Sequence, residues 1–279
     1  MHESHPSLAA LRGRIAMLAG AAPAEAGRIV TGHGGIDGAL GGGLARGRLH
    51  EIFAADAGEA GSAAGFAAML ALRARAVEMA DGDADVDAHP GEGLLWLRCD
   101  EAERRGGGLY APGLADLGGA ADGLLLAVAP DPVALLRGAG DAARCPGLAV
   151  VVVECWGDPR VLDLTATRRL TLAAEDSGVP VLLLRIDARA SPSAADTRWR
   201  VRAAPSRALA ANAPGQAAFE VELLRQRSGI ADLRWRVEWD RERIVFREAI
   251  REPALPGAVV PLPSRGSAAG GATADRRIA

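Results

Sequence analysis

Four residues stand where a phosphate-binding loop would form. Gly58, Glu59, Gly61 and Ser62 lie in the stretch FAADAGEAGSAAGFAAML, residues 53–70, between a short apolar segment and a longer one. In a phosphate loop, backbone N–H groups at a helix start hold the phosphates, a lysine reaches the terminal phosphates and a hydroxyl holds Mg²⁺. Only Ser62 fits, because the 279-residue sequence has no lysine, and Asp56 and Glu59 carry the same sign of charge as phosphate. We therefore predict a vestigial phosphate loop with no cofactor and no ATPase activity.

Two further acidic residues follow apolar stretches that are typical of buried strands. Glu154 comes directly after Val150–Val153, and Asp100 comes directly after the stretch LLWLRC, residues 94–99. The carboxyl ends of parallel strands are the usual place for catalytic groups in α/β proteins. Without a bound phosphate these carboxylates have nothing to activate, so we predict no catalytic residue.

The elements that must position these residues follow from the hydrophobic pattern. Continuous apolar runs predict buried strands at 49–53, 94–101, 123–130, 147–156 and 179–188, and a short apolar segment lies between Gly-rich turns at 28–30. Helices are expected at 65–79, 132–143 and 161–178, the last ended by Gly178, and a helix or turn at 108–118. Polar and apolar residues alternate at 197–206, 217–229 and 232–240, which is typical of antiparallel edge strands. The predicted class is α/β, with a mostly parallel central sheet and antiparallel strands on its C-terminal side.

The composition changes at both ends of this pattern. Residues 1–27 read as a short helix and a linker, residues 28–249 as the core domain, and residues 250–279 as a flexible tail rich in Pro, Gly and Ala. The first segment carries an apolar stripe of Leu8, Leu11, Ile15 and Leu18 at helical spacing. Such a stripe packs on the same chain, on a second copy or on a partner.

Charge and cysteine usage narrow the class of protein. The formal net charge of −3 gives no bulk attraction to DNA or to membranes. Three cysteines without metal-ligand spacing suit a reducing cytoplasm, and neither a secretory signal nor an apolar run of about 18 residues is present. We predict no metal site, since the acidic residues at 81–92 have Val86 where a calcium loop needs glycine. The expected location is cytoplasmic.

Several segments in order resemble the RecA ATPase core, from about Arg28 to Phe246. The stretch GGIDGALGGGLARGRLHEIFA resembles the lead-in to its first core strand, and GLAVVVVECW holds the Walker B position, which makes Glu154 Walker B-like. The resemblance implies a RecA-like P-loop NTPase core with a degenerate Walker A motif, because the Walker A lysine is absent.

A closer resemblance is to the ImuA family of RecA-like proteins from bacterial SOS mutagenesis cassettes. It rests on TRRLTLAAEDSGVPVLLLR, then SPSAADTRWRV, then ELLRQRSG. The resemblance implies a non-catalytic accessory role in translesion DNA synthesis. The implied partner is an ImuB-type polymerase-like protein, with RecA and an error-prone DNA polymerase as further candidates. Two alternatives stay open: an ATP-binding RecA-family ATPase that uses another loop, and a SulA-like cell-division inhibitor.

An arginine-rich stretch surrounds SPSAADTRWRV. The candidate contact residues for a partner or for DNA are Arg189, Arg198, Trp199, Arg200, Arg202 and Arg207. Arginine and aromatic side chains favour such contacts, whereas the structural alternative is an edge strand with a charged outer face. DNA contact is expected to be indirect, and no membrane contact is expected. The apolar stripe of residues 8–18 is the candidate for self-association or docking.

Overall fold

The computed structural model describes residues 27–76, 93–119, 123–207, 209, 211, 213, 215–227, 229 and 231–249. All of these belong to one compact unit, and residues 250–279 lie outside the described residues. The stripe of Leu8, Leu11, Ile15 and Leu18 and the acidic residues at 81–92 also lie outside them.

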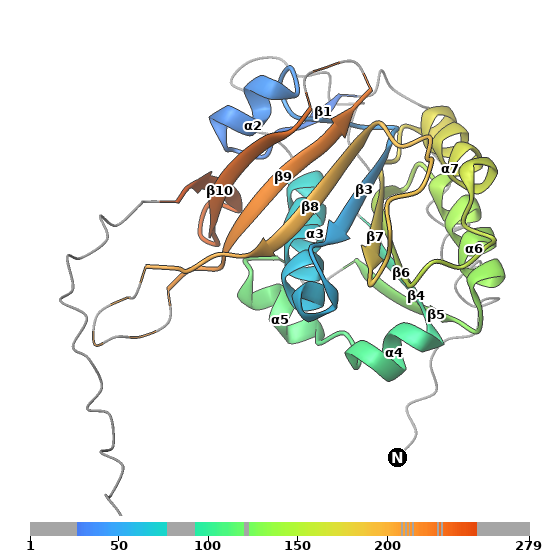
Figure 1. Ribbon diagram of the computed structural model, residues 1–279, viewed down its shortest axis with the longest axis horizontal. Coiled ribbons are helices and arrows are strands. Elements are labelled where there is room, and N and C mark those ends of the chain that lie inside the picture. The colour runs from blue at the N-terminus through green and yellow to red at the C-terminus, as the bar shows by residue number, and fades with distance from the viewer. Residues whose placement is uncertain are drawn as a thin grey trace, which may run out of the picture. The chain divides into compact units, whose positions relative to one another are not determined.

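A nine-stranded sheet forms the centre of the fold (Figure 1). In spatial order its strands are β11 (Val245–Glu248), β10 (Leu233–Asp240), β9 (Ala218–Gln226), β8 (Thr197–Ala203), β3 (Leu49–Ala54), β7 (Val181–Ile186), β6 (Leu148–Trp156), β4 (Gly93–Cys99) and β5 (Leu124–Ala129). The six strands from β8 to β5 are parallel, whereas β9, β10 and β11 pair antiparallel. The predicted α/β class with a mostly parallel sheet is therefore confirmed.

Helices cover both faces of the sheet. They are α2 (Gly34–Ala39), α3 (Ala60–Arg75), α4 (Asp100–Gly106), α5 (Ala111–Asp116), α6 (Pro132–Ala143) and α7 (Leu164–Ser177), with a 3₁₀ turn η1 (Ala57–Glu59) before α3 and a small ladder of β1 (Arg28–Ile29) and β2 (Leu44–Ala45). Successive residues of β6 alternate between two cores: Val152 packs with α3, and Val153 packs with α6 and α7. Because both faces of such a strand are buried, its sequence is apolar at nearly every position.

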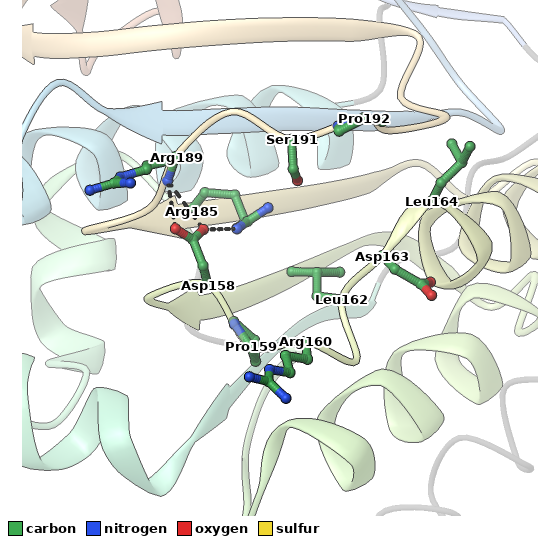
Figure 2. A pocket seen from close by; sticks show the side chains of 10 residues that line it. All are labelled: Asp158, Pro159, Arg160, Leu162, Asp163, Leu164, Arg185, Arg189, Ser191 and Pro192. Atoms are coloured by element: carbon green, nitrogen blue, oxygen red, sulfur yellow. Dashed lines mark hydrogen bonds and ion pairs between the residues drawn. The ribbon is translucent and has the colours of Figure 1, made fainter.

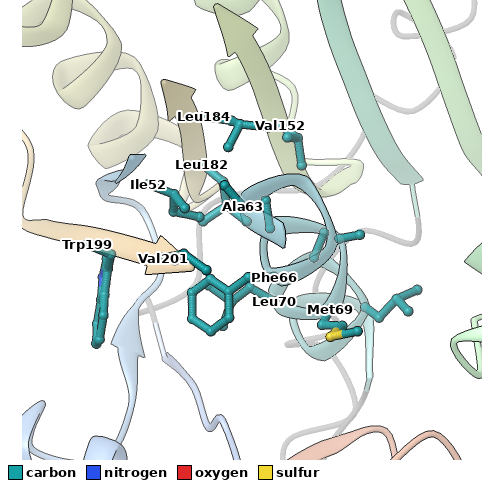
Figure 3. Close-up of a cluster of buried hydrophobic side chains, with 14 of the residues drawn as sticks. Ile52, Ala63, Phe66, Met69, Leu70, Val152, Leu182, Leu184, Trp199 and Val201 are labelled. Carbon is teal, nitrogen blue, oxygen red and sulfur yellow. The ribbon is translucent and has the colours of Figure 1, made fainter. Parts of the chain in front are cut away.

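The α3 side of the sheet holds the aromatic part of the core. Phe66 of α3 packs beside Trp199 and Val201 of β8 and Ile52 of β3 (Figure 3). Its ring centroid lies 5.9 Å from that of Phe219 and 5.1 Å from that of Phe246. Tilted and edge-on pairs of this kind stabilise a core beyond the area they bury. Helix α3 is thus fixed by strands from both the parallel and the antiparallel part of the sheet.

Local sequence signals explain where α6 and α7 begin and end. Asp131 caps α6 by accepting the Ala134 N–H at 2.8 Å, and Asp163 caps α7 by accepting the Ala166 N–H at 2.8 Å. Gly178 ends α7 with a φ of 79°, a left-handed conformation that favours glycine. Both helices therefore match their predicted limits closely.

Three sequence predictions need correction. Helix α3 begins at Ala60 rather than at residue 65, so the loop before it is shorter than expected. Helices α2 and α4 lie where the sequence indicated only turns and strand ends. Strand β8 is not an antiparallel edge strand, because it pairs parallel with β3 and antiparallel with β9 inside the sheet.

A chain of buried hydrogen bonds links β8 to β3. The Trp199 indole N–H donates to the Thr197 hydroxyl at 2.8 Å, and Thr197 Oγ1 lies 2.8 Å from His50 Nδ1. His50 Nε2 lies 2.8 Å from the carbonyl oxygen of Ala45, which only accepts, so this nitrogen carries the proton and Nδ1 accepts from Thr197. Burial lowers the pKa of His50, and the imidazole stays neutral.

Candidate functional site

The predicted phosphate loop is the junction between β3 and α3. The chain passes from Ala54 through Ala55 and Asp56 into the η1 turn, and α3 begins directly after Glu59. The carboxylate of Asp56 accepts a hydrogen bond from the Gly58 N–H at 2.8 Å and caps the η1 turn. A negative side chain therefore already occupies one of the backbone donors that a phosphate would use.

Glu59 accepts two further hydrogen bonds at the start of α3. Its carboxylate oxygen Oε2 accepts a 2.6 Å hydrogen bond from the Ser62 hydroxyl and a 2.8 Å hydrogen bond from the backbone N–H of Ala203, at the end of β8. Ser62, the one residue of this loop whose hydroxyl could take the Mg²⁺-binding role, thus donates its proton to a protein carboxylate. Gly58 and Gly61 have no left-handed φ, so neither glycine is needed for the course of the backbone.

Glu154 lies in a buried cluster two strands away from β3. Its oxygen Oε1 accepts from Arg98 at 2.8 Å and from the Trp156 indole at 2.8 Å, and Oε2 accepts from the Trp96 indole at 2.9 Å. Arg98 also pairs with Glu103 at 3.0 Å. Both carboxylate oxygens of Glu154 are therefore already bonded to donors of the protein. Asp100 is exposed at the first residue of α4, where a negative charge favours the helix start.

The cysteines are buried in the core on the α6 and α7 side. Burial raises the pKa of Cys99 to about 12, with the neighbouring Cys155 adding to the effect. Burial also raises the pKa of Cys155 to about 11, although the charge of Arg185 opposes this shift. Burial raises the pKa of Cys145 as well. Thiols of this kind are poor nucleophiles. In the described residues, no group of three or more His, Cys, Asp or Glu side chains is arranged to hold a metal ion.

Three arginines of the predicted contact surface form ion pairs with acidic residues of the same chain. Arg198 pairs with buried Glu51 at 2.6 Å, Arg200 with Glu222 at 3.0 Å, and Arg202 with Glu220 at 3.8 Å. Burial alone would raise the pKa of Glu222, but Arg234 and Arg200 outweigh it and the pKa is lowered.

Three members of the arginine stretch are exposed, among them Arg202 on β8, and its tryptophan is not. Arg189 and Arg207 lie at the surface on either side of β8. Trp199 is only 1% exposed and packs against α3, so its predicted place on a contact surface is corrected: it belongs to the core.

A pocket of about 590 Å³ adjoins Arg189 (Figure 2). Its lining comes from the turns that follow β6 and β7, where Asp158 accepts hydrogen bonds from Arg185 at 2.9 Å and from the Arg189 N–H at 3.1 Å. The sequence reasoning missed Asp158 and Arg185. A charged residue inside the buried strand VLLLRI was the available signal, because arginine is rarely buried without a partner.

The strand order and the β3–α3 junction define the class of protein. It is an α/β protein whose large, mostly parallel sheet is compatible with a RecA-like fold. None of the helices in the described residues is long and apolar enough to cross a membrane.

Comparisons with known proteins give the family. No protein-family model matches the sequence. The chain is 33% identical over 219 residues to Protein ImuA of Caulobacter vibrioides strain NA1000 / CB15N, and the matched region covers 75% of each chain. Protein ImuA of Caulobacter vibrioides strain ATCC 19089 / CIP 103742 / CB 15 is similar to the same extent. The chain belongs to the ImuA family, as its sequence resemblance predicted.

Proposed function

We propose that this ImuA-family protein is a non-catalytic RecA-like accessory protein of SOS-induced translesion DNA synthesis. It acts through contacts with an ImuB-type polymerase-like protein, and RecA and an error-prone polymerase are further candidate partners. The observation that carries the proposal is the start of α3, where Asp56 and Glu59 take the backbone and hydroxyl donors of the junction. Family membership supports the biological role.

The electrostatics of the junction argue against a bound triphosphate. Two like charges about 4 Å apart repel by about 4 kcal/mol at an effective dielectric constant of about 20. The arginines of α3, Arg73 and Arg75, lie in its last turn, at the opposite end from the junction. Arg73 is moreover bonded to the carbonyl oxygens of Val30 and Ile244. A nucleotide at this junction would therefore meet two carboxylates and no cation of α3.

The Walker B-like position supports the same proposal. A metal ion at Glu154 would have to displace Arg98 and two indole donors from a carboxylate that is almost fully buried. Removing one partner from a buried ion pair strongly destabilises a protein. We infer that Glu154 stabilises the fold instead of holding Mg²⁺.

Nucleotide binding is the first test. Titration of the full chain with a fluorescent ATP analogue and Mg²⁺ is expected to show no saturation below about 100 μM. Saturable binding in that range, competed by unlabelled ATP, would contradict the proposal and favour the ATPase alternative. A matched variant, Ser62→Ala, is expected to behave as the wild type.

Copurification is the second test, because it separates the mutagenesis role from the cell-division role. The tagged full chain is expected to retain the ImuB-type protein of its own organism. Retention of FtsZ, without retention of the ImuB-type protein or of RecA, would refute the mutagenesis role and favour the SulA-like alternative.

A further inference from the structure

Helices α6 and α7 lie side by side (Figure 1). A groove between them is lined by aliphatic and charged side chains. The groove has a volume of about 570 Å³, and its aliphatic lining includes Val133 and Leu136 of α6, Val161 before α7 and Leu170 of α7. Val133 is 47% exposed and Val161 is 41% exposed. Exposed aliphatic residues that gather along one groove are typical of a binding surface, whereas single ones are common everywhere.

Two further apolar side chains of α7 are exposed, although neither lines the groove. Leu164 is 51% exposed and lines the pocket beside Arg189, and Leu172 is 47% exposed. Of the six large apolar side chains that stand out as exposed in the described residues, Val133 and Val161 line the groove and two more belong to α7. The remaining two, Tyr110 and Leu209, lie elsewhere in the chain.

Three arginines line the groove: Arg137, Arg144 and Arg169. In the part of the chain that the structure describes, none of the three forms an ion pair with a carboxylate. On β8 and β10, by contrast, arginines do have partners: Arg200 and Arg234 both pair with Glu222.

Two aspartates also line the groove. Asp163 caps α7 through the Ala166 N–H, and Asp141 belongs to α6. Arginines outnumber aspartates three to two in the lining, so the groove keeps an excess of positive charge. A ligand that carries carboxylates complements it, and the aliphatic lining requires apolar side chains in the same ligand.

The lining favours a protein segment over a nucleic acid. Single-stranded nucleic acids bind with their bases stacked on aromatic side chains. The residues that line the described groove are aliphatic, polar or charged, and none of them is aromatic. Leucine, isoleucine or valine side chains of a helix or strand fit such a surface better than bases do.

We propose that the α6–α7 groove binds an acidic segment of a partner protein, with aliphatic side chains in the hollow and carboxylates against Arg137, Arg144 and Arg169. This inference rests on the proposed accessory function and names the surface through which that function is carried out. Residues 250–279 of this chain are a poorer occupant, because they carry four arginines and only two acidic residues.

Fluorescence anisotropy of the full-length protein tests the proposal. The probe is a fluorescein-labelled peptide of about four helical turns, with leucine at every third or fourth position and Asp or Glu elsewhere. Arg137→Glu with Arg169→Glu is expected to weaken binding about tenfold or more, because it replaces attraction by repulsion. Val133→Asp is expected to weaken it similarly. Arg243→Glu is the matched control, since Arg243 is exposed outside the groove, and is expected to leave binding unchanged.

The other possible results each show whether the α6–α7 groove binds the acidic segment. Equal binding of wild type and Arg137→Glu/Arg169→Glu, with both proteins showing the same melting temperature, would overturn the proposal. So would tighter binding of a labelled oligothymidylate that depends on the same arginines. A dimer abolished by Arg137→Glu would assign the groove to a second copy. Affinity for the peptide that rises about tenfold in Leu11→Asp/Ile15→Asp would assign it to residues 1–27.

The experiments can refute binding at the α6–α7 groove and the proposed accessory function independently of each other. If the tagged chain retains the ImuB-type protein and Arg137→Glu/Arg169→Glu retains it equally, the accessory function stands and the groove is not its surface. If the fluorescent ATP analogue binds while the acidic peptide still depends on Arg137 and Arg169, the groove stands and the non-catalytic function falls.

Discussion

The backbone N–H of Ala203 donates a hydrogen bond across 2.8 Å to the carboxylate of Glu59. This bond joins the end of β8 to the start of α3, which are far apart in the sequence. The same carboxylate oxygen accepts the proton of Ser62. The strand–loop–helix junction is therefore stabilised by the negative charge that makes it unsuited to a phosphate.

Glu59→Ala is expected to lower the free energy of unfolding by about 1–2 kcal/mol, because the Ala203 N–H and the Ser62 hydroxyl lose their acceptor. Urea denaturation monitored by circular dichroism measures the change. Glu220→Ala is the control: its ion pair with Arg202 spans 3.8 Å between exposed side chains, so it is expected to change stability by less than about 1 kcal/mol. Equal effects of the two substitutions would contradict this account of the junction.

Glu154→Ala is expected to cost about 3–5 kcal/mol, because Arg98 and two indole N–H groups lose a buried acceptor. Glu103→Ala removes a more exposed partner of Arg98 and is expected to cost clearly less. The melting temperature of the wild type is expected not to change on addition of millimolar Mg²⁺. A marked Mg²⁺-dependent rise that disappears in Glu154→Gln would instead indicate a metal site.

His50 is expected to make the protein less stable in weak acid. Burial lowers the pKa of the native imidazole, so below about pH 6.5 the unfolded chain binds a proton that the folded chain does not. The free energy of unfolding therefore falls as the pH drops below about 6.5, by at most about 1.4 kcal/mol per pH unit from this group. Urea unfolding from about pH 7.5 to 5.5 is expected to show a shallower slope for His50→Gln. Identical slopes would exclude His50 as the cause.

The three thiols are expected to resist modification in the native protein. The pKa values of about 12 for Cys99 and about 11 for Cys155 leave almost no thiolate at about pH 8, and both side chains are buried. Ellman's reagent is therefore expected to react slowly with the folded chain and fully after addition of guanidinium. Rapid reaction of one thiol without denaturant would show that its surroundings open more readily than the packing indicates.

Local signals predicted the parts of the fold that depend on neighbouring residues. The limits of α6 and α7 follow from Asp131, Asp163 and Gly178, which act on the turns beside them. The direction of β8 does not follow from local pattern. One face of β8 is buried under α3 while Arg198, Arg200 and Arg202 are on the other, which gives an alternating sequence even though β8 pairs parallel with β3.

The candidate site was predictable only in part for the same reason. The absence of lysine and the charges of Asp56 and Glu59 can be read directly from the sequence. The acceptor role of Glu59 toward Ala203, and the pairing of Arg198 with Glu51, join residues more than 140 positions apart. Such contacts depend on the tertiary fold, and so do the burial of Trp199 and the groove between α6 and α7.

The aromatic cluster under α3 includes Phe66 and Phe246, whose ring centroids lie 5.1 Å apart, and the Phe246 N–H bonds to the carbonyl oxygen of Thr31 at 2.9 Å. The last strand of the core thus completes the packing of its first segments. During synthesis on the ribosome, α3 emerges long before Trp199, Phe219 and Phe246, the aromatic residues that pack against it. A nascent chain arrested before β11 still lacks Phe246, one of three aromatic side chains that pack against Phe66, so the core is completed only when its last strand is made.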